Sequence, residues 1–247
     1  MTLFTSYAAT RPATGLGRFA ASMRRAAASL LSVAAVATGL AGGVAEAAIV
    51  IPVNIGQPDT AALLLTGQIM QGDLGRLQAA VSKVPTGKKI VLLLESPGGS
   101  VDEGLAIGRF VYASKITTIA IEGPGCASAC SFIFLAGRDS SGKAMRIMMS
   151  GARVGMHHVR VTPNAQVSGA EAAEMQTVAQ LGIAKLEAFF RELSIPGEFL
   201  SMTLAAPANS MNWLREFDAL RLGIFVMDPS TGRLITPDVF KRQTAMR

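Results

Sequence analysis

Three segments of the chain carry residue types suited to nucleophilic chemistry. The segment ESPGGS, residues 95–100, has two adjacent glycines, which allow positive φ and a close approach of the backbone to another group. The segment EGPGCASACSFIFLAG, residues 122–137, places Ser128 among small side chains. His157 and His158, the only histidines, follow in ARVGMHHVR. A nucleophilic serine needs a base within reach and N–H donors for the developing oxyanion, and these segments supply all three kinds of group.

Each of these features also has a purely structural interpretation. A Gly-Gly turn between a strand and a helix is often only a turn, small residues suit any tightly packed helix, and a pair of histidines can simply lie on the surface. Adjacent residues of a strand point to opposite faces, so at most one of His157 and His158 can face Ser128.

The two cysteines of the chain, Cys126 and Cys130, flank Ser128. Residues four apart within one helix keep their Cβ atoms roughly 5–6 Å apart, farther than the ~3.5–4.5 Å of a disulfide. A disulfide therefore requires Cys126 to precede the helix. The sequence leaves two alternatives for these cysteines, a disulfide or two free thiols. A zinc site of two cysteines and two histidines is disfavoured because the adjacent histidines diverge. We expect neither a metal nor a cofactor.

The elements that must position these residues alternate between apolar strands and amphipathic helices. Such alternation indicates an α/β protein with a mainly parallel sheet. A long helix begins at Ser168-Gly169-Ala170-Glu171, which has capping-box spacing, and ends before Pro196. The pattern predicts strands at 61–69, 88–95, 115–123, 146–150 and 152–161, and helices at 73–84, 101–114, 127–137, 168–193 and 212–222.

The N-terminal segment has the pattern of an export signal. Met23-Arg24-Arg25 precedes an uncharged run, and Ala45-Glu46-Ala47 then forms a small-residue cleavage site. We therefore expect a signal peptide at 1–47, with the start at Met1 or at Met23, then a linker at 48–60 and one domain at 61–247. The expected location is the bacterial periplasm. The alternative is a retained N-terminal anchor, and only then do we expect contact with a membrane.

Charge and aromatic content argue against nucleic acid as a partner. The formal net charge is +6, but four arginines and one glutamate lie before Ala48, which leaves +3 for the rest. Two tyrosines and one tryptophan offer few stacking platforms.

Taken in order, four segments resemble the proteolytic subunit of the Clp protease, in the Clp/crotonase superfamily. They read LLLTGQI, SPGGSVDEGLAIGRFVYAS, GPGCASACSFIFLAG and ARVGMHH, and the resemblance covers roughly residues 61–223. It implies an α/β fold of repeated β-β-α units with a mainly parallel sheet. It also makes helix 168–193 the handle-like helix that mediates subunit contacts, so a homo-oligomer is expected.

The same resemblance implies roles for four residues. Ser128 matches the nucleophile and His157 the general base, and the pattern in ARVGMH favours His157 over His158. Gly99 and Ala129 match the residues whose N–H groups form the oxyanion hole. The segment SPGGSV also resembles signal peptide peptidases, in which a lysine is the base, but the histidine in register favours the Ser–His pair.

One position departs from the family pattern. Met211 stands where the acidic third member of the triad is expected. Asn209 or Asn212 could orient the imidazole, but an amide does not stabilise the imidazolium as a carboxylate does, and loss of the acid can lower turnover by about 10⁴.

The resemblance thus implies one of two functions. The first is an exported serine hydrolase that cleaves short or unfolded peptide or protein chains through an acyl-enzyme. The second is a catalytically inactive member that serves as an oligomeric binding or scaffold protein. A crotonase-type acyl-CoA enzyme is disfavoured, because export separates it from acyl-CoA.

Overall fold

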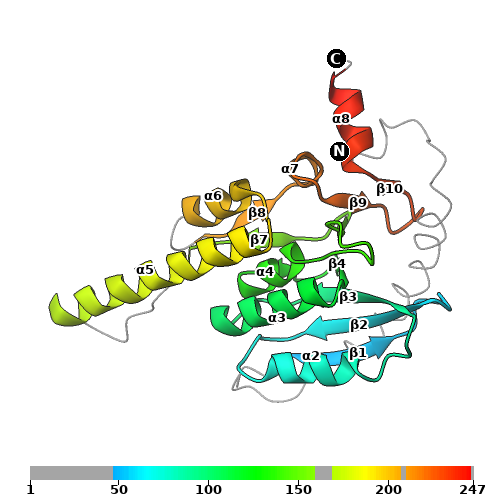
Figure 1. Ribbon diagram of the computed structural model, residues 1–247. Coiled ribbons are helices and arrows are strands. Elements are labelled where there is room, and N and C mark those ends of the chain that lie inside the picture. The colour runs from blue at the N-terminus through cyan, green and yellow to red at the C-terminus, as the bar shows by residue number, and fades with distance from the viewer. Residues whose placement is uncertain (1–46, 159–168, 207–209, 246–247) are drawn as a thin grey trace.

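Seven strands form the main sheet of the computed structural model, which describes residues 47–158, 169–206 and 210–245. The inner strands run parallel, whereas the two edge strands are antiparallel to their neighbours. This arrangement confirms the predicted mainly parallel α/β sheet (Figure 1). Across the sheet the order is β1 (Ile49–Val53), β2 (Thr60–Thr66), β3 (Lys89–Glu95), β4 (Thr117–Ala120), β6 (Arg146–Met149), β9 (Phe225–Met227) and β10 (Leu234–Ile235).

The central residues of the inner strands β2 and β3 are apolar, and both faces of these strands are buried there. Leu92, Leu93 and Leu94 of β3 are each 0% exposed. Since successive side chains of a strand point to opposite faces, burial of all three shows that the sheet is covered on both sides, as is usual for parallel sheets.

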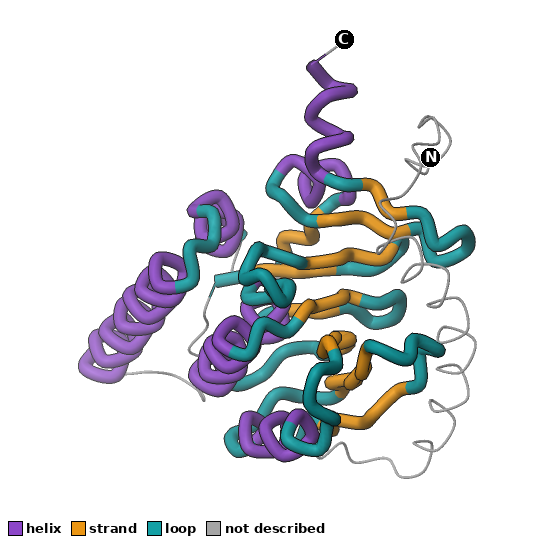
Figure 2. The backbone as a smooth tube through the Cα atoms, turned by 45° about the vertical axis from the view of Figure 1, so that its right-hand side comes forward, coloured by secondary structure: helices purple, strands orange, loops and turns teal. Residues whose placement is uncertain are grey.

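Helices line one face of this sheet, as Figure 2 shows. On that face α3 packs against α4, and a Cβ added to Gly104 of α3 would lie 2.9 Å from the Cβ of Ala129. Among the described residues, no helix has both the length and the apolar character needed to cross a membrane. The helices are α2 (Asp73–Val81), α3 (Val101–Ala113), α4 (Ala129–Leu135), α5 (Gly169–Glu192), α6 (Gly197–Ala205), α7 (Glu216–Arg221) and α8 (Pro237–Ala245).

A second, smaller sheet holds β5 (Cys126–Ala127), β7 (Val154–Met156) and β8 (Asn212–Leu214). After β4 and again after β6, the chain forms one of these short strands before it enters the next helix. Isolated parallel bridges between Ile69 and Gly99 and between Ser96 and Cys126 extend the same layer. The predicted β-β-α repeat is therefore present, and its second strands form a layer of their own.

The long helix α5 projects from the body of the protein (Figure 1). Its C-terminal part is anchored, since Leu186, Phe189 and Phe190 are at most 3% exposed. Nearer its N-terminus, Val178 and Leu181 are 48% and 58% exposed. The predicted handle-like helix is thus confirmed, with two large apolar side chains on its projecting part.

Two predictions about secondary structure were wrong. The expected linker at 48–60 contains β1, which pairs with β2 from Ile49 opposite Thr66 to Val53 opposite Ala62. Pro52 makes this segment look irregular, but a proline is tolerated here because β1 is an edge strand.

The expected helix at 212–222 was the second error. Its first three residues form β8, which pairs with β7, and only Glu216–Arg221 are helical. Helices α6 and α8 were not expected at all. The export signal was expected at 1–47, and its residues up to 46 lie outside the described residues. The helix cap expected at Ser168 also lies outside them.

Candidate active site

Ser128 and His157, the predicted nucleophile and base, lie next to each other. Nε2 of His157 is 2.8 Å from Oγ of Ser128. Ser128 follows β5 and His157 follows β7, and these two short strands are parallel neighbours. The carboxyl ends of neighbouring parallel strands lie at the same edge, which is why residues far apart in the sequence meet here. His158 is the next residue, and the hydrogen-bond contact of the Ser128 hydroxyl is with His157.

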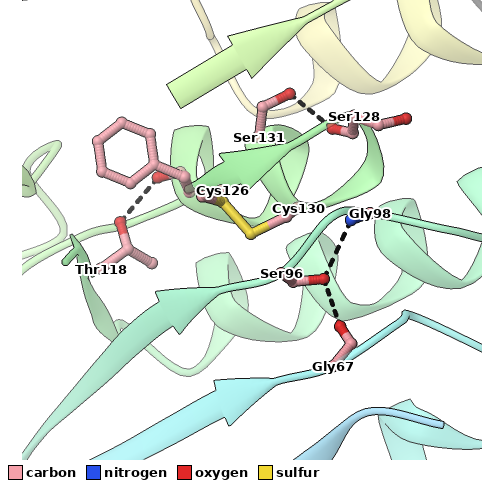
Figure 3. Close-up of a disulfide and its surroundings, with 9 residues drawn as sticks. Gly67, Ser96, Gly98, Thr118, Cys126, Ser128, Cys130 and Ser131 are labelled. Carbon is pink, nitrogen blue, oxygen red and sulfur yellow. Dashed lines mark hydrogen bonds between the residues drawn. A yellow bond between two sulfur atoms is a disulfide. The ribbon is translucent and has the colours of Figure 1, made fainter. Parts of the chain in front are cut away.

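The backbone of Ser128 has an unusual conformation, with φ 54° and ψ −125°. A non-glycine residue in such a region costs about 1–3 kcal/mol, and the surrounding structure must enforce it. The N–H of Ser128 donates to the carbonyl of Gly155 at 2.9 Å. Its carbonyl accepts from Oγ of Ser131 at 2.7 Å and from the N–H of Ser131 at 2.9 Å (Figure 3).

Ser131 is therefore a structural neighbour of the candidate nucleophile. It is 0% exposed, and its hydroxyl is directed at the Ser128 carbonyl. The sequence did not reveal this role, because the serine at the end of CASACS looks like another small residue of a packed helix.

The two glycines of SPGGS are both required by close contacts. A Cβ on Gly98 would lie 2.6 Å from Cβ of Ser128, and a Cβ on Gly99 would lie 2.1 Å from the carbonyl oxygen of Ile69. Their φ angles, 95° and 145°, also favour glycine. The extension of β2 clamps this turn, because Ile69 donates to the Gly98 carbonyl and accepts from the N–H of Ser100, both at 2.8 Å.

The predicted oxyanion donors lie beside the nucleophile. Ala129 follows Ser128 directly, and Gly98, the neighbour of Gly99, packs against Ser128. Within the described part of the chain, no hydrogen-bond acceptor is found for the N–H of Gly99 or of Ala129. Both donors are thus available to a substrate oxygen, as an oxyanion hole requires.

Ser96 supports the glycine turn and was not identified from the sequence. Its hydroxyl donates to the carbonyl of Gly67 at 2.6 Å and accepts from the N–H of Gly98 at 3.1 Å (Figure 3). With 1% exposure it is one of the few buried polar residues. It connects the start of the turn to the end of β2.

Met211, at the position where the family resemblance expects an acid, directly precedes β8. The β7–β8 register ends with Met156 opposite Asn212, so Met211 and His157 are the next residues beyond the last pair. Cγ of Met211 lies 2.5 Å from the position that a Cβ on Gly155 would take. The thioether side chain therefore folds over Gly155, two residues before His157.

The two asparagines do not take over this place in the described structure. Nδ2 of Asn212 donates to the carbonyl of Met202 at 3.2 Å, which ties β8 to α6. By strand alternation its side chain shares a face with Met156 and not with His157. Asn209 lies outside the described residues.

Cys126 and Cys130 form a disulfide. The expected helix at 127–137 starts two residues later, at Ala129, so Cys126 belongs to β5 and precedes the helix, as a bridge requires. The two cysteine thiols are therefore not available to a metal. In the described ranges, no group of three or more His, Cys, Asp or Glu side chains is placed to hold a metal ion.

One acidic group near the site is perturbed by burial. Glu95 ends β3, and its Oε1 lies 2.8 Å from the position of a Cβ on Gly123, in the loop before β5. Burial raises the pKa of Glu95 above its ordinary value of 4.5. On the other side of the small sheet, the guanidinium of Arg153 lies 4.0 Å from the ring centroid of Trp213.

The fold and the site together define an α/β protein with a serine hydrolase-like site. The serine sits on a strained strand-to-helix turn, contacts a histidine and has two available N–H groups beside it. The sequence matches the family model of the Clp protease over residues 62–187, and the chain belongs to this family. The predicted resemblance is thereby confirmed.

Among solved structures, the chain is similar to a point mutant of ClpP1 from Listeria monocytogenes. The sequence identity is 18% and the TM-score 0.49, and the match covers 69% of this chain and 93% of that chain. No curated protein matches the sequence.

Proposed function

We propose that the protein is an exported serine hydrolase that cleaves peptide bonds through an acyl-enzyme. The observation that carries this proposal is the 2.8 Å contact between Oγ of Ser128 and Nε2 of His157. A nucleophile with a base in hydrogen-bond reach, next to unengaged N–H donors, is the minimal arrangement for acyl transfer. Membership of the Clp protease family supports peptide bonds as the substrate class.

In the proposed reaction His157 acts first as a base and then as an acid in each half-reaction. Oγ of Ser128 attacks the scissile carbonyl while Nε2 of His157 takes its proton. The N–H groups of Gly99 and Ala129 donate to the oxyanion of the tetrahedral intermediate. His157 then gives the proton to the leaving amine, and water releases the acyl group by the same steps in reverse order.

The proposed substrates are short or unfolded chains. In an oxidising compartment outside the cytoplasm, ATP is scarce, so an ATP-driven unfolding partner is not expected there. A peptidase without such a partner acts on chains that are already extended.

A fluorophosphonate probe tests this function directly. The wild-type protein should be labelled, because the probe phosphonylates an activated serine, and Ser128→Ala should not be labelled. Ser131→Ala is the matched control, since Ser131 lies in the same CASACS segment but has its hydroxyl on the Ser128 carbonyl. Absence of wild-type labelling, or equal labelling of Ser128→Ala, would contradict the proposal.

A second candidate is an inactive binding or scaffold protein of the same fold. The specific observation in its favour is Met211, a residue without a carboxylate at the position where the family resemblance expects the acid of the triad. The probe experiment separates the two candidates, because a scaffold with a disabled site gives no labelling above the Ser128→Ala background.

We also propose that α5 makes contact with a second copy of the chain. Leu181 is 58% exposed and Val178 48% exposed on the projecting part of this helix, and the family typically assembles into homo-oligomers. Light scattering coupled to size exclusion should give a mass above the 25.7 kDa of one chain. Leu181→Glu should lower that mass, whereas the same substitution at an exposed residue of α2, Ala79→Glu, should not.

Export is proposed from the N-terminal segment alone. Deletion of residues 23–47 should leave the protein in the cytoplasmic fraction, and the full chain should be recovered from the periplasmic fraction. Recovery of the full chain with the membrane would support a retained anchor instead.

A further inference from the structure

The disulfide between Cys126 and Cys130 spans the candidate nucleophile (Figure 3). Cys126 lies in β5 and Cys130 is the second residue of α4, so the bond joins the strand to the first helical turn across Ser128. Both cysteines are 0% exposed. They are the only cysteines in the chain, so no other residue competes for either thiol.

The local sequence favours a different conformation from the one observed. Residues 127–137 have the small and apolar composition of a helix, and a helix that started at 127 would place Ser128 in the right-handed region. The observed helix starts at Ala129, and Ser128 has φ 54°. The strained turn is therefore imposed on the segment by its surroundings.

The disulfide excludes a helix that extends α4 back through Ser128 to Cys126. With both cysteines in one helix, their Cβ atoms would be roughly 5–6 Å apart, whereas a disulfide needs ~3.5–4.5 Å. The bond can close only if the chain is not helical throughout between Cys126 and Cys130. In the structure Ala127 belongs to β5 and Ser128 has φ 54°, so the helix stops short of both residues.

The hydrogen bonds around Ser128 constrain its backbone conformation less strongly than the disulfide does. The bond from the N–H of Ser131 to the Ser128 carbonyl spans three residues, and such a bond also fits the first turn of a longer helix. The bond from the N–H of Ser128 to the Gly155 carbonyl fixes the peptide before Ser128 and not its φ angle.

We propose that the Cys126–Cys130 disulfide positions the nucleophile, so that the hydrolase becomes active only when this bond has formed. This inference rests on the proposed function. The bond holds Ser128 in the conformation that directs Oγ to Nε2 of His157 and leaves the N–H of Ala129 beside it. When the bond is reduced, α4 extends toward residue 127, and Oγ of Ser128 moves away from the imidazole.

The consequence is an enzyme controlled by its compartment. Thiols stay reduced in the cytoplasm and are oxidised outside it, so chains that have not been exported would be kept inactive. The reverse step is thiol–disulfide exchange. A dithiol such as dithiothreitol is oxidised to its cyclic disulfide, and the two cysteines gain two hydrogens and become thiols.

The test compares the oxidised and reduced forms of the full-length protein. Mass spectrometry first establishes the redox state from the gain of two hydrogens. The rate of fluorophosphonate labelling of folded protein is then measured for both forms, together with kcat and KM on a fluorogenic peptide. We expect reduction to slow labelling and to lower kcat by about tenfold or more, which corresponds to the usual preference against such a backbone conformation, with little change in KM.

The double variant Cys126→Ala/Cys130→Ala is the matched control. It should be as slow as the reduced wild type, and dithiothreitol should not change it further. Thermal unfolding of each form shows that the samples are folded at the assay temperature. Equal labelling rates of the oxidised, reduced and double-variant proteins, all folded, would overturn the positioning role.

Hydrogen exchange provides a readout that does not depend on activity. We expect the amides of residues 127–131 to exchange differently in the oxidised and reduced forms, while those of β3 stay unchanged. If the oxidised wild type is not labelled but this exchange difference is present, the proposed function fails and the positioning of Ser128 by the disulfide stands. If the wild type is labelled and neither rate nor exchange responds to reduction, the positioning role fails alone.

Discussion

Restoring an acid at position 211 is the sharpest test of how this site works. Continuing the register of β7 and β8 by one pair beyond Met156 and Asn212 would set Met211 opposite His157, and directly opposed residues have Cβ atoms about 4.5–5.5 Å apart. Met211→Asp would therefore place a carboxylate next to the imidazole. The Met211 side chain is only partly buried, so the shorter aspartate can keep some contact with water.

The expected gain follows from the distance. Two unit charges about 5 Å apart attract each other by about 3 kcal/mol at an effective dielectric constant of about 20. This attraction acts on the imidazolium that forms as Ser128 is deprotonated, and each 1.36 kcal/mol corresponds to about a tenfold rate. Partial desolvation of the new carboxylate reduces the benefit. We therefore expect kcat on a peptide substrate to rise roughly tenfold to a hundredfold.

The assay is the pH dependence of kcat/KM for wild type, Met211→Asp and the neutral control Met211→Asn. A carboxylate favours the charged imidazolium, so the acid limb of the profile should move to higher pH in Met211→Asp. The gain is therefore measured on the plateau above that limb, where His157 is neutral and can act as a base. An equal rate for the Asp and Asn variants on the plateau would refute the assignment of Met211 to the place of the acid.

Two further predictions concern the glycine turn and a partly buried carboxylate. Gly99→Ala should lower kcat by about 10²–10³, the usual effect of losing one oxyanion donor, because its Cβ would lie 2.1 Å from the Ile69 carbonyl oxygen. Gly87→Ala, with φ 87° and no neighbour within 4 Å, carries the same backbone penalty and should leave kcat unchanged. Glu95→Gln should raise the melting temperature near pH 7. Burial raises the pKa of Glu95 above 4.5, so its charged form destabilises the fold at pH values above that range. The difference should shrink as the pH falls toward 4 and the wild-type carboxyl is protonated, and Glu122→Gln, at an exposed position, should show no such trend.

The parts of the fold that the sequence predicted are those governed by local patterns. The apolar run of β3, the helix that starts after Ser100 and the helix α5 all have a periodicity that depends only on neighbouring residues. The candidate pair Ser128 and His157 was also identified, because strand-turn-helix segments at the same edge of a parallel sheet bring their first residues together.

The parts that were missed depend on distant partners. Pro52 made β1 look like a linker, and only its pairing with β2 at the sheet edge makes it a strand. Residues 212–214 form a strand because β7 lies beside them, although their composition also fits a helix. The hydroxyl of Ser96 donates to the carbonyl of Gly67, which is 29 residues away, so this partner is not visible in the local sequence.

The residue at which α4 starts bears on whether Cys126 and Cys130 can form a disulfide. A helix that included Cys126 would prevent the bridge, and sequence patterns place helix ends only to within one or two residues. Here Cys126 and Ala127 belong to β5, and the disulfide to Cys130 joins this strand to the first turn of α4.

The strained conformation of Ser128 bears on the choice between an enzyme and a scaffold. A residue with φ 54° and ψ −125° costs about 1–3 kcal/mol, and a protein that only binds a partner gains nothing from holding a buried serine turn in that form. The same geometry is useful to a nucleophile, because it turns Oγ toward the base and leaves the next N–H beside the oxyanion. Loss of the triad acid lowers turnover but leaves the oxyanion hole and substrate binding, which alone retain about 10³–10⁴ of rate enhancement over water. We therefore expect a slow hydrolase rather than a scaffold, and a labelling rate above the Ser128→Ala background decides between them.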